Sequence, residues 1–326
     1  MMEALLETYG EGLVLFGLGG LVGLVFGAAG YQSKFCLRAA TVEVAEGRLD
    51  ARQIANAGSL SGAIIGGVLF GAGMILARGC ASRLLVLSAT GNLRAIVTGL
   101  ILTIVAQASL TGVLSPARIA LSDLWSVPGD AARDLLAIVG LDAQLMAGIS
   151  GLLVIGSVIF AMRLNVAVSH IVGAVVVGLA VTAGWVGTYQ ISQASFDVIQ
   201  VSSITFTGPS TDTLMALVNA PSAPLEFGLG LVPGVFLGAG TLAVMSGGFQ
   251  LERFGSDTPM EKYLVGAVLM GFGSMLAGGR AVGAGMSGGA IFSLTAWVAV
   301  GCMWLGAMVT HLVMGFKFRR RQLDLS

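Results

Sequence analysis

A ten-residue stretch occurs twice in this chain, two hundred positions apart. The first copy reads Gly71-Ala72-Gly73-Met74-Ile75-Leu76-Ala77-Arg78-Gly79-Cys80, and the second reads Gly271-Phe272-Gly273-Ser274-Met275-Leu276-Ala277-Gly278-Gly279-Arg280. Five of the ten positions are identical. A shorter upstream pattern, Gly30-Tyr31-Gln32, also returns as Gly248-Phe249-Gln250, each time just after an apolar run.

The repeat indicates how the chain is organised. We predict a single transmembrane domain, residues 1–326, built from two related halves at 12–114 and 228–314. Residues 115–227 would connect the halves, and residues 315–326 would form a basic tail. We favour an inverted repeat, in which the two halves cross the membrane in opposite directions.

The composition excludes a water-soluble protein. Hydrophobic residues make up 56 % of the 326 positions and charged residues only 10 %, whereas about a quarter of a soluble domain is charged. Several apolar runs reach the ~20 residues that span a bilayer as a helix. We therefore predict an all-α polytopic membrane protein, with spans in the runs 13–29, 96–114, 146–162, 166–186 and 294–314.

Two apolar pieces, Ala63 to Ala77 and Leu264 to Ala277, are shorter than a full span and end at the repeated motif. Broken backbone at membrane depth is tolerated where it is buried in protein or lines a wet cavity. We interpret the pieces as re-entrant half-helices. Paired breaks of this kind indicate the substrate site of a transporter.

The residues at the breaks favour an anion that carries sulfur. Cys80 lies between Arg78 and Arg83, and Arg280 takes the place of Cys80 in the second copy. Guanidinium groups inside a membrane are costly and mark a pathway or site. A thiol near arginines ionises or donates hydrogen bonds more readily than a free one.

Other classes of function lack support. The net charge is zero, without a basic stripe, so we expect no nucleic-acid partner. The three cysteines, Cys36, Cys80 and Cys302, form no metal-binding spacing, and we expect no cofactor and no metal.

The loop charges predict an orientation. Residues 187–226 carry Asp197, Asp212 and Glu226 without Lys or Arg, and we interpret them, like 31–58 and 115–143, as loops or interfacial helices. The tail carries Lys317, Arg319, Arg320 and Arg321. The positive-inside rule predicts that the tail lies in the cytoplasm and residues 187–226 outside.

The sequence resembles the YeeE/YedE family of bacterial thiosulfate permeases and their relatives over nearly the whole chain. The resemblance rests on three groups of residues: Ser33-Lys34-Phe35-Cys36; Arg78-Gly79-Cys80 with Gly91-Asn92-Leu93-Arg94; and Gly278-Gly279-Arg280 with Val282-Gly283-Ala284-Gly285.

The resemblance implies an hourglass-like, pseudo-symmetric bundle in which thiosulfate passes cysteine thiols through S–H to sulfur hydrogen bonds. Cys36 and Cys80 match the first two thiols of the family, and Arg280 stands where the third is expected. The predicted substrate path comprises Cys36, Cys80, Arg78, Arg83, Arg280, Gly79 and Gly279, with Lys34 and Arg38 at its mouth.

Other interpretations stay open at this stage. Cys36 and Cys80 are also explained as small buried apolar side chains, and Arg78 and Arg83 as side chains that reach the membrane interface. The leading prediction is an inner-membrane permease for thiosulfate or a related small sulfur-containing anion, and not an enzyme. The alternative is a membrane sulfurtransferase, or a scaffold that hands sulfur to a small sulfur-carrier protein.

Overall fold

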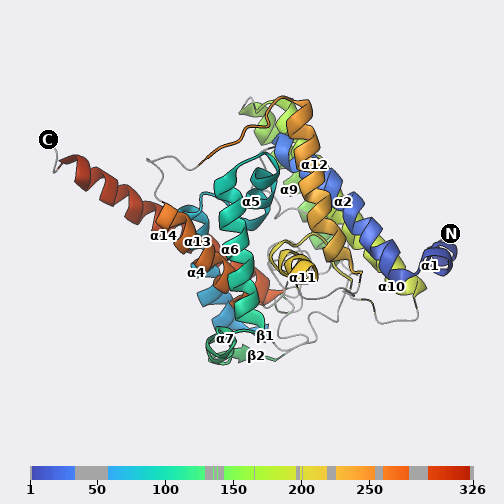
Figure 1. Ribbon diagram of the computed structural model, residues 1–326, viewed down its shortest axis with the longest axis horizontal. Coiled ribbons are helices and arrows are strands. Elements are labelled where there is room, and N and C mark those ends of the chain that lie inside the picture. The colour runs from blue at the N-terminus through green and yellow to red at the C-terminus, as the bar shows by residue number, and fades with distance from the viewer. Residues whose placement is uncertain are drawn as a thin grey trace.

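The structure, a computed structural model, describes residues 2–33, 58–128, 135, 138, 143–164, 166–195, 199, 201–218, 225–253, 260–278 and 293–323. Helices dominate this part of the chain (Figure 1), which confirms the all-α class. The helices are α1 Met2–Tyr9, α2 Glu11–Ser33, α4 Leu60–Leu76, α5 Ala81–Ala89, α6 Leu93–Leu110, α7 Ser115–Ser122, α9 Ala143–Arg163, α10 Val168–Ala194, α11 Thr207–Val218, α12 Phe227–Met245, α13 Met260–Leu276 and α14 Leu294–Leu323. Two short strands, β1 Gly58–Ser59 and β2 Ser126–Val127, pair antiparallel.

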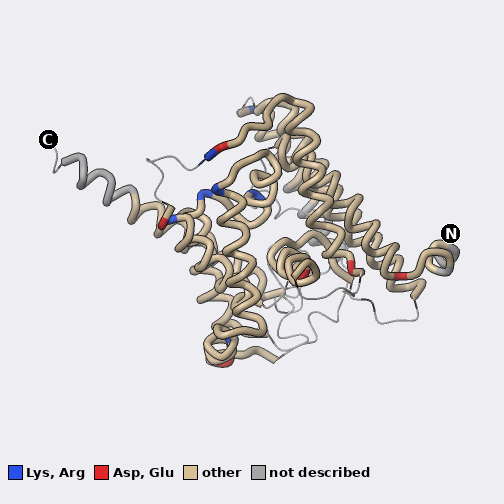
Figure 2. The backbone as a smooth tube through the Cα atoms, in the orientation of Figure 1, with Lys and Arg blue, Asp and Glu red and all other residues tan. Residues whose placement is uncertain are grey.

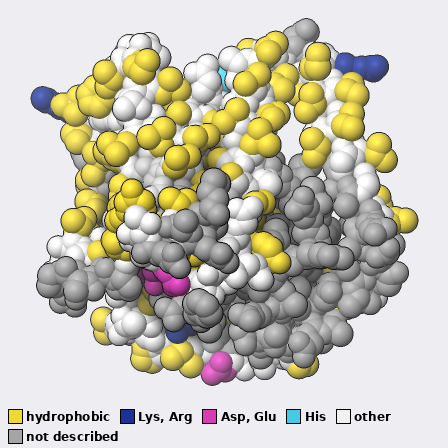
Figure 3. Space-filling view, turned by 90° about the vertical axis from the view of Figure 1, so that its right-hand side faces the viewer, with side chains coloured by type: hydrophobic (Ala, Val, Ile, Leu, Met, Phe, Trp, Pro, Cys, Tyr) yellow, Lys and Arg dark blue, Asp and Glu magenta, His cyan; other side chains and the backbone are white. Residues whose placement is uncertain are grey.

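Six stretches among the described residues are long and apolar enough to cross a membrane, which confirms a polytopic membrane protein. One face of the molecule, drawn in Figure 3, is covered over much of its described surface by hydrophobic side chains, as lipid contact requires. The stretches are Glu11–Ser33, Leu60–Ala89, Leu93–Leu110, Val168–Ala194, Phe227–Met245 and Leu294–Met314.

One predicted boundary is wrong. The apolar run was expected to end near Val186, but α10 continues to Ala194. The hydroxyl of Thr188 donates to the carbonyl oxygen of Ser202 at 2.7 Å, so this part of the helix is held by the chain that returns beside it. The polar residues of the last two turns are therefore helical rather than part of a loop.

The helices α4 and α13 run antiparallel, and glycines let their backbones come into close contact. A Cβ added at Gly66 would lie 2.5 Å from the carbonyl oxygen of Gly273, and one added at Gly273 would lie 2.7 Å from that of Gly66. In the same way, a Cβ added at Gly73 would lie 2.6 Å from the carbonyl oxygen of Gly266, and one added at Gly266 would lie 2.9 Å from that of Gly73. Backbones approach this closely only through small residues, so the glycines set the spacing of the two repeated helices.

A second pair, α2 and α12, is also joined by glycines but runs in the same direction. Gly19, Gly23 and Gly27 each abut the backbone of α12, and Gly230, Gly234 and Gly238 each abut that of α2. A two-fold axis that relates two parallel helices runs parallel to them, whereas one that relates two antiparallel helices runs perpendicular to them. One axis that related both pairs would therefore have to be parallel to α2 and α12 and perpendicular to α4 and α13. The two-half repeat, its inversion and the hourglass shape stay predictions.

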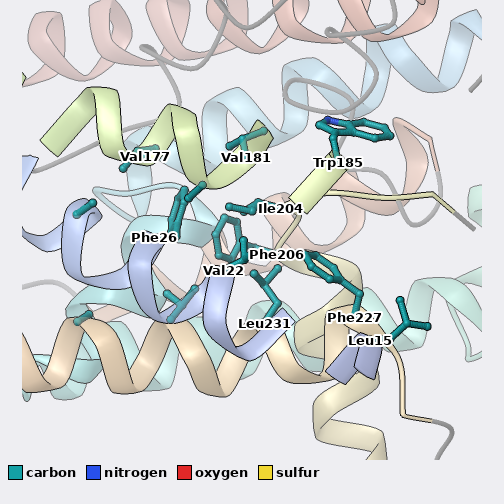
Figure 4. Close-up of a cluster of buried hydrophobic side chains, with 14 of the residues drawn as sticks. Leu15, Val22, Phe26, Val177, Val181, Trp185, Ile204, Phe206, Phe227 and Leu231 are labelled. Carbon is teal, nitrogen blue, oxygen red and sulfur yellow. The ribbon is translucent and has the colours of Figure 1, made fainter. Parts of the chain in front are cut away.

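The helices form two groups, each with its own hydrophobic core. In the first group α2, α10 and α12 surround a core that includes Phe26, Trp185 and Leu231 (Figure 4). In the second group α4, α6, α13 and α14 surround a core that includes Phe70 and Met270. The short helices α5 and α11 contact both groups.

Most of the described Lys and Arg residues lie toward one end of the molecule (Figure 2), where Glu252 and Glu261 also lie. At one end Tyr31 meets Ser246 and the N–H of Leu93 donates to Glu252, which joins the ends of α2, α6 and α12. We call this the basic end. It holds Arg78, Arg94, Arg163, Arg253 and Lys262, and α14, which runs parallel to α4, carries the basic tail toward it.

The opposite end, where α2 and α12 begin and α7 lies, is the acidic end. It holds Glu11, Asp123 and Glu226, with Arg118 as an exception. The N-termini of α2 and α12 are held together because Gly12 abuts Leu225. Both α2 and α12 therefore run from the acidic end to the basic end, as helices that cross a membrane run from one side to the other.

Candidate functional site

The repeated motif forms a sharp helix end after α4. The N–H of Gly79 donates to the carbonyl oxygen of Met74 at 3.1 Å, and the N–H of Arg78 donates to that of Ile75 at 3.3 Å. These two bonds are those of a Schellman motif, which closes a helix through a left-handed residue. Here that residue is Arg78, with φ 56°, although glycine is the usual choice.

Cys80 begins the next helix directly after this turn. Its extended backbone, φ −82° and ψ 172°, makes it the N-cap residue of α5, and its carbonyl oxygen accepts the N–H of Leu84 at 2.9 Å. The thiol is 2 % exposed and lies 3.1 Å from the hydroxyl of Ser82. The broken helix thus holds a thiol in a buried position.

The two arginines beside Cys80 differ in their surroundings. Arg78 is exposed, whereas Arg83 is half-buried and lies over Gly79, with its side-chain carbons about 3.5 Å from where a Cβ of Gly79 would be. Gly79 therefore leaves room for the stem of Arg83. Arg83 is therefore packed by its stem against the turn that Gly79 forms, in the first turn of the helix that Cys80 caps.

The break lies where the two helix groups meet. Ala81, the residue after Cys80, packs against the cores of both groups. Further along α5, Val86 lies near Gly30 of α2, and Ala89 lies near Gly240 of α12. The buried thiol is therefore at the junction between the groups, the kind of place where transporters bind their substrates.

The other predicted site residues fall outside the described part of the chain. They are Lys34, Cys36, Arg38, Gly279 and Arg280. The helices that lead to the two breaks are described, however. Ala77 lies beside Gly266, and Ala277 lies beside Gly66, so the breaks leave α4 and α13 at opposite ends of the pair.

Cys302 and the two histidines lie apart from the break. Cys302 is half-buried in the uninterrupted helix α14, where its Cβ contacts Gly67. His170 is half-buried, and a ring nitrogen lies 3.0 Å from the carbonyl oxygen of Gln32 at the end of α2. His311 is exposed on α14.

The motif Gly91-Asn92-Leu93-Arg94 has a clear structural partner that sequence reasoning missed. Asn92 caps α6, because its side chain accepts the N–H of Ala95 at 3.1 Å, and its amide donates to Glu252. Both Nε and Nη2 of Arg94 donate to the carbonyl oxygen of Arg253 at 3.3 Å. The motif therefore ties α6 to the end of the first helix group. The repeated stretch Gly248-Phe249-Gln250, followed by Arg253, was the signal in the sequence that this segment has a role of its own.

A multi-pass helical protein with a buried thiol at a broken helix between two helix groups has the features of a membrane transporter. Residues 11–309 match the sequence profile of the sulphur transport family, and the chain belongs to that family. This confirms the resemblance to YeeE/YedE proteins. The chain is also similar to the thiosulfate transporter TsuA of Escherichia coli (strain K12), with 28 % identity over 150 residues. That match covers 46 % of this chain and 40 % of TsuA.

Proposed function

We propose that this chain is an inner-membrane permease that takes up thiosulfate or a related small sulfur-containing anion, and that it is not an enzyme. Membership of the sulphur transport family and the similarity to a thiosulfate transporter support the class of substrate. The observation that carries the proposal is the burial of Cys80 at the broken helix between the two helix groups.

In this proposal the path runs along the junction and includes Arg78, Gly79, Cys80 and Arg83. The thiol of Cys80 donates to the terminal sulfur of the anion, a weak bond that permits release as well as binding, as conduction requires. Because the thiol is 2 % exposed, the break must open during transport. Cys36, Gly279 and Arg280 extend the path, and Lys34 and Arg38 raise the local anion concentration at its mouth.

The basic end faces the cytoplasm in this proposal. Arg94, Arg163, Arg253 and Lys262 lie there together with the end of α14 that leads into the basic tail. Cytoplasmic loops of membrane proteins carry an excess of Lys and Arg. This end would also be the one that meets a soluble sulfur-carrier protein, if such a partner receives the sulfur.

The test is uptake of radiolabelled thiosulfate by proteoliposomes that contain the purified protein, with sulfate and selenite as competitors. Cys80→Ala should lower the uptake rate about fivefold, because it removes the weak hydrogen bond from the thiol to the anion. Cys302→Ala removes a half-buried thiol from the uninterrupted helix α14, so it is the matched control and should leave uptake unchanged.

Equal uptake by both variants at matched protein amounts would remove Cys80 from the path. No uptake by the parent protein of any of the three anions would overturn the transport proposal. A persulfide trapped on Cys80, in a parent that does not transport, would support the sulfurtransferase alternative.

A further inference from the structure

The N-terminus of α11 is buried inside the protein. Phe206 is 3 % exposed, Thr207 and Thr211 are fully buried, and Gly208 is buried as well. α11 packs against α12 of the first helix group and α6 of the second. This short helix therefore lies between the two groups, as α5 does, and its start at Phe206 is part of the core of the first group.

The residue at the N-cap position of α11 cannot cap the helix with its side chain. The N–H of Ser210 donates to the carbonyl oxygen of Phe206 at 2.9 Å, which makes Phe206 the N-cap residue. A phenylalanine side chain cannot accept the free N–H groups of a first turn. Pro209 has no N–H, so the N–H groups of Thr207 and Gly208 remain, and neither has a partner among the described residues.

Two hydroxyls next to these N–H groups also lack partners. Within the described part of the chain, the buried oxygens of Thr205 and Thr207 make no hydrogen bond. Nearby hydroxyls do: Ser203 donates to the carbonyl oxygen of Val181 at 2.6 Å, and Thr211 donates to that of Thr207 at 2.7 Å. The unpaired hydroxyls are thus confined to the start of α11.

The third buried group without a partner among the described residues, the indole N–H of Trp185, belongs to α10 rather than to the segment that leads into α11. Ile204 and Phe206 point into the core of the first group, where Phe206 lies 5.2 Å from Phe26 between ring centres. Side chains alternate along an extended segment, so Thr205 faces away from that core.

We propose that the buried start of α11 is a binding site for the oxygen atoms of a small oxyanion. An unpaired buried polar group is costly, and where no water reaches it the cost is higher still. Free N–H groups at a helix start attract anions through hydrogen bonds and the helix dipole. The hydroxyls of Thr205 and Thr207 add two neutral donors, and transport requires binding that is weak enough for release.

This inference rests on the proposed function and adds to it. Thiosulfate has three oxygens at one end and a sulfur at the other. The start of α11 would bind the oxygen end of the anion, whereas Cys80 would bind the sulfur end. Sulfate has only oxygens, so it should bind at α11 without any contribution from the thiol.

The experiment measures binding of thiosulfate and of sulfate to the purified protein in lipid nanodiscs by calorimetry. Thr207→Val keeps the shape of the side chain and removes the hydroxyl. We expect it to weaken binding of both anions at least about tenfold, since it deletes a hydrogen bond to a charged ligand. Thr205→Val should act in the same direction. Cys80→Ala should weaken binding of thiosulfate and leave that of sulfate unchanged.

Thr211→Val is the matched control, because Thr211 is equally buried one turn along the same helix but its hydroxyl is already paired. It should leave both affinities unchanged. Thermal unfolding without ligand checks that Thr207→Val is folded, and its melting temperature should equal or exceed that of the parent, because an unpaired buried hydroxyl has been removed.

Parental affinity of Thr207→Val for both anions would overturn the inference, and so would a parent protein that binds neither anion. The proposed function fails separately, if the parent does not transport thiosulfate in proteoliposomes. Binding that depends on Thr207 would then still establish the oxyanion site.

Discussion

Arg78 and Gly278 occupy the same position of the repeat, and both have a positive φ, 56° and 157°. Each follows an alanine at the end of a 17-residue helix, Ala77 after α4 and Ala277 after α13. Only Gly278 can adopt such a backbone conformation without a steric cost. The chain therefore keeps a strained arginine next to Cys80, where glycine would form the same turn more easily.

This relationship predicts that Arg78→Gly makes the protein more stable and less active. The free energy of unfolding should rise by about 1 kcal/mol, because the left-handed conformation costs a non-glycine residue that amount. Thiosulfate uptake should fall because the guanidinium is lost. Arg78→Ala should lower uptake without the gain in melting temperature. Full activity of Arg78→Gly would show that the guanidinium has no role in transport.

The crossing of α4 and α13 gives a second prediction. Gly66→Ala should destabilise the protein by about 2 kcal/mol, because the new Cβ forces two backbones apart. Gly273→Ala should do the same, and the double variant should cost less than the sum, since one separation of the helices relieves both contacts. Melting curves in detergent measure this.

The control for that experiment is Gly99→Ala on α6, where nothing lies within 4 Å of an added Cβ. This substitution should be neutral or slightly stabilising, because alanine favours a helix over glycine. Equal melting temperatures for Gly66→Ala and Gly99→Ala would contradict the close approach of α4 and α13.

The orientation of the chain can be tested at its two ends. A fluorescent protein fused after the basic tail should fluoresce, because that tail is proposed to lie in the cytoplasm. Asp123→Cys, at the acidic end, should react in intact spheroplasts with a thiol reagent that does not cross membranes. Arg253→Cys, exposed at the basic end, should react only after lysis. The opposite labelling pattern would invert the proposed topology.

Sequence patterns predicted the helices better than their ends or their polar contacts. The long apolar runs became α2, α6, α10 and α14, because a span of hydrophobic residues has few alternatives in a bilayer. The break after Ala77 was also predicted, from the repeated motif. The end of α10 was missed, since Tyr189 to Gln193 looked like loop residues, and the bond from Thr188 to the returning chain is not visible in the sequence.

The start of α11 shows why a site of this kind is hard to find from sequence. Thr205, Thr207, Gly208 and Pro209 form a polar stretch that resembles an ordinary exposed turn. Its burial and its unpaired hydroxyls depend on packing between two helix groups, which no local pattern encodes. A threonine next to a helix start was the one local signal.

The mouth of the path provides a prediction that comes from the sequence alone. Lys34→Gln with Arg38→Gln should raise the concentration of thiosulfate needed for half-maximal uptake at low salt, because these cations attract the anion over a distance that salt shortens. The parent and the double variant should converge at high salt. A change confined to the maximal rate would mean that the two residues act elsewhere than at the mouth.

The last prediction concerns Arg280, which stands where the family resemblance expects a third thiol. Because α4 and α13 run in opposite directions, the break that leads to Arg280 leaves the helix pair at the end opposite to Cys80, about 15 residues or ~22 Å along the helices. With the basic end in the cytoplasm, as proposed, we predict that Arg280 acts in the outer half of the path. A fixed cation there should capture anions before they reach the thiol, so Arg280→Ala should weaken the apparent affinity for thiosulfate and for sulfate alike.

Arg280→Cys should recover uptake of thiosulfate and not of sulfate, because a thiol donates only a weak hydrogen bond and suits the sulfur end of the anion. Uptake assays of the three proteins with each anion decide between these roles. If Arg280→Ala transports as well as the parent, Arg280 takes no part in the pathway.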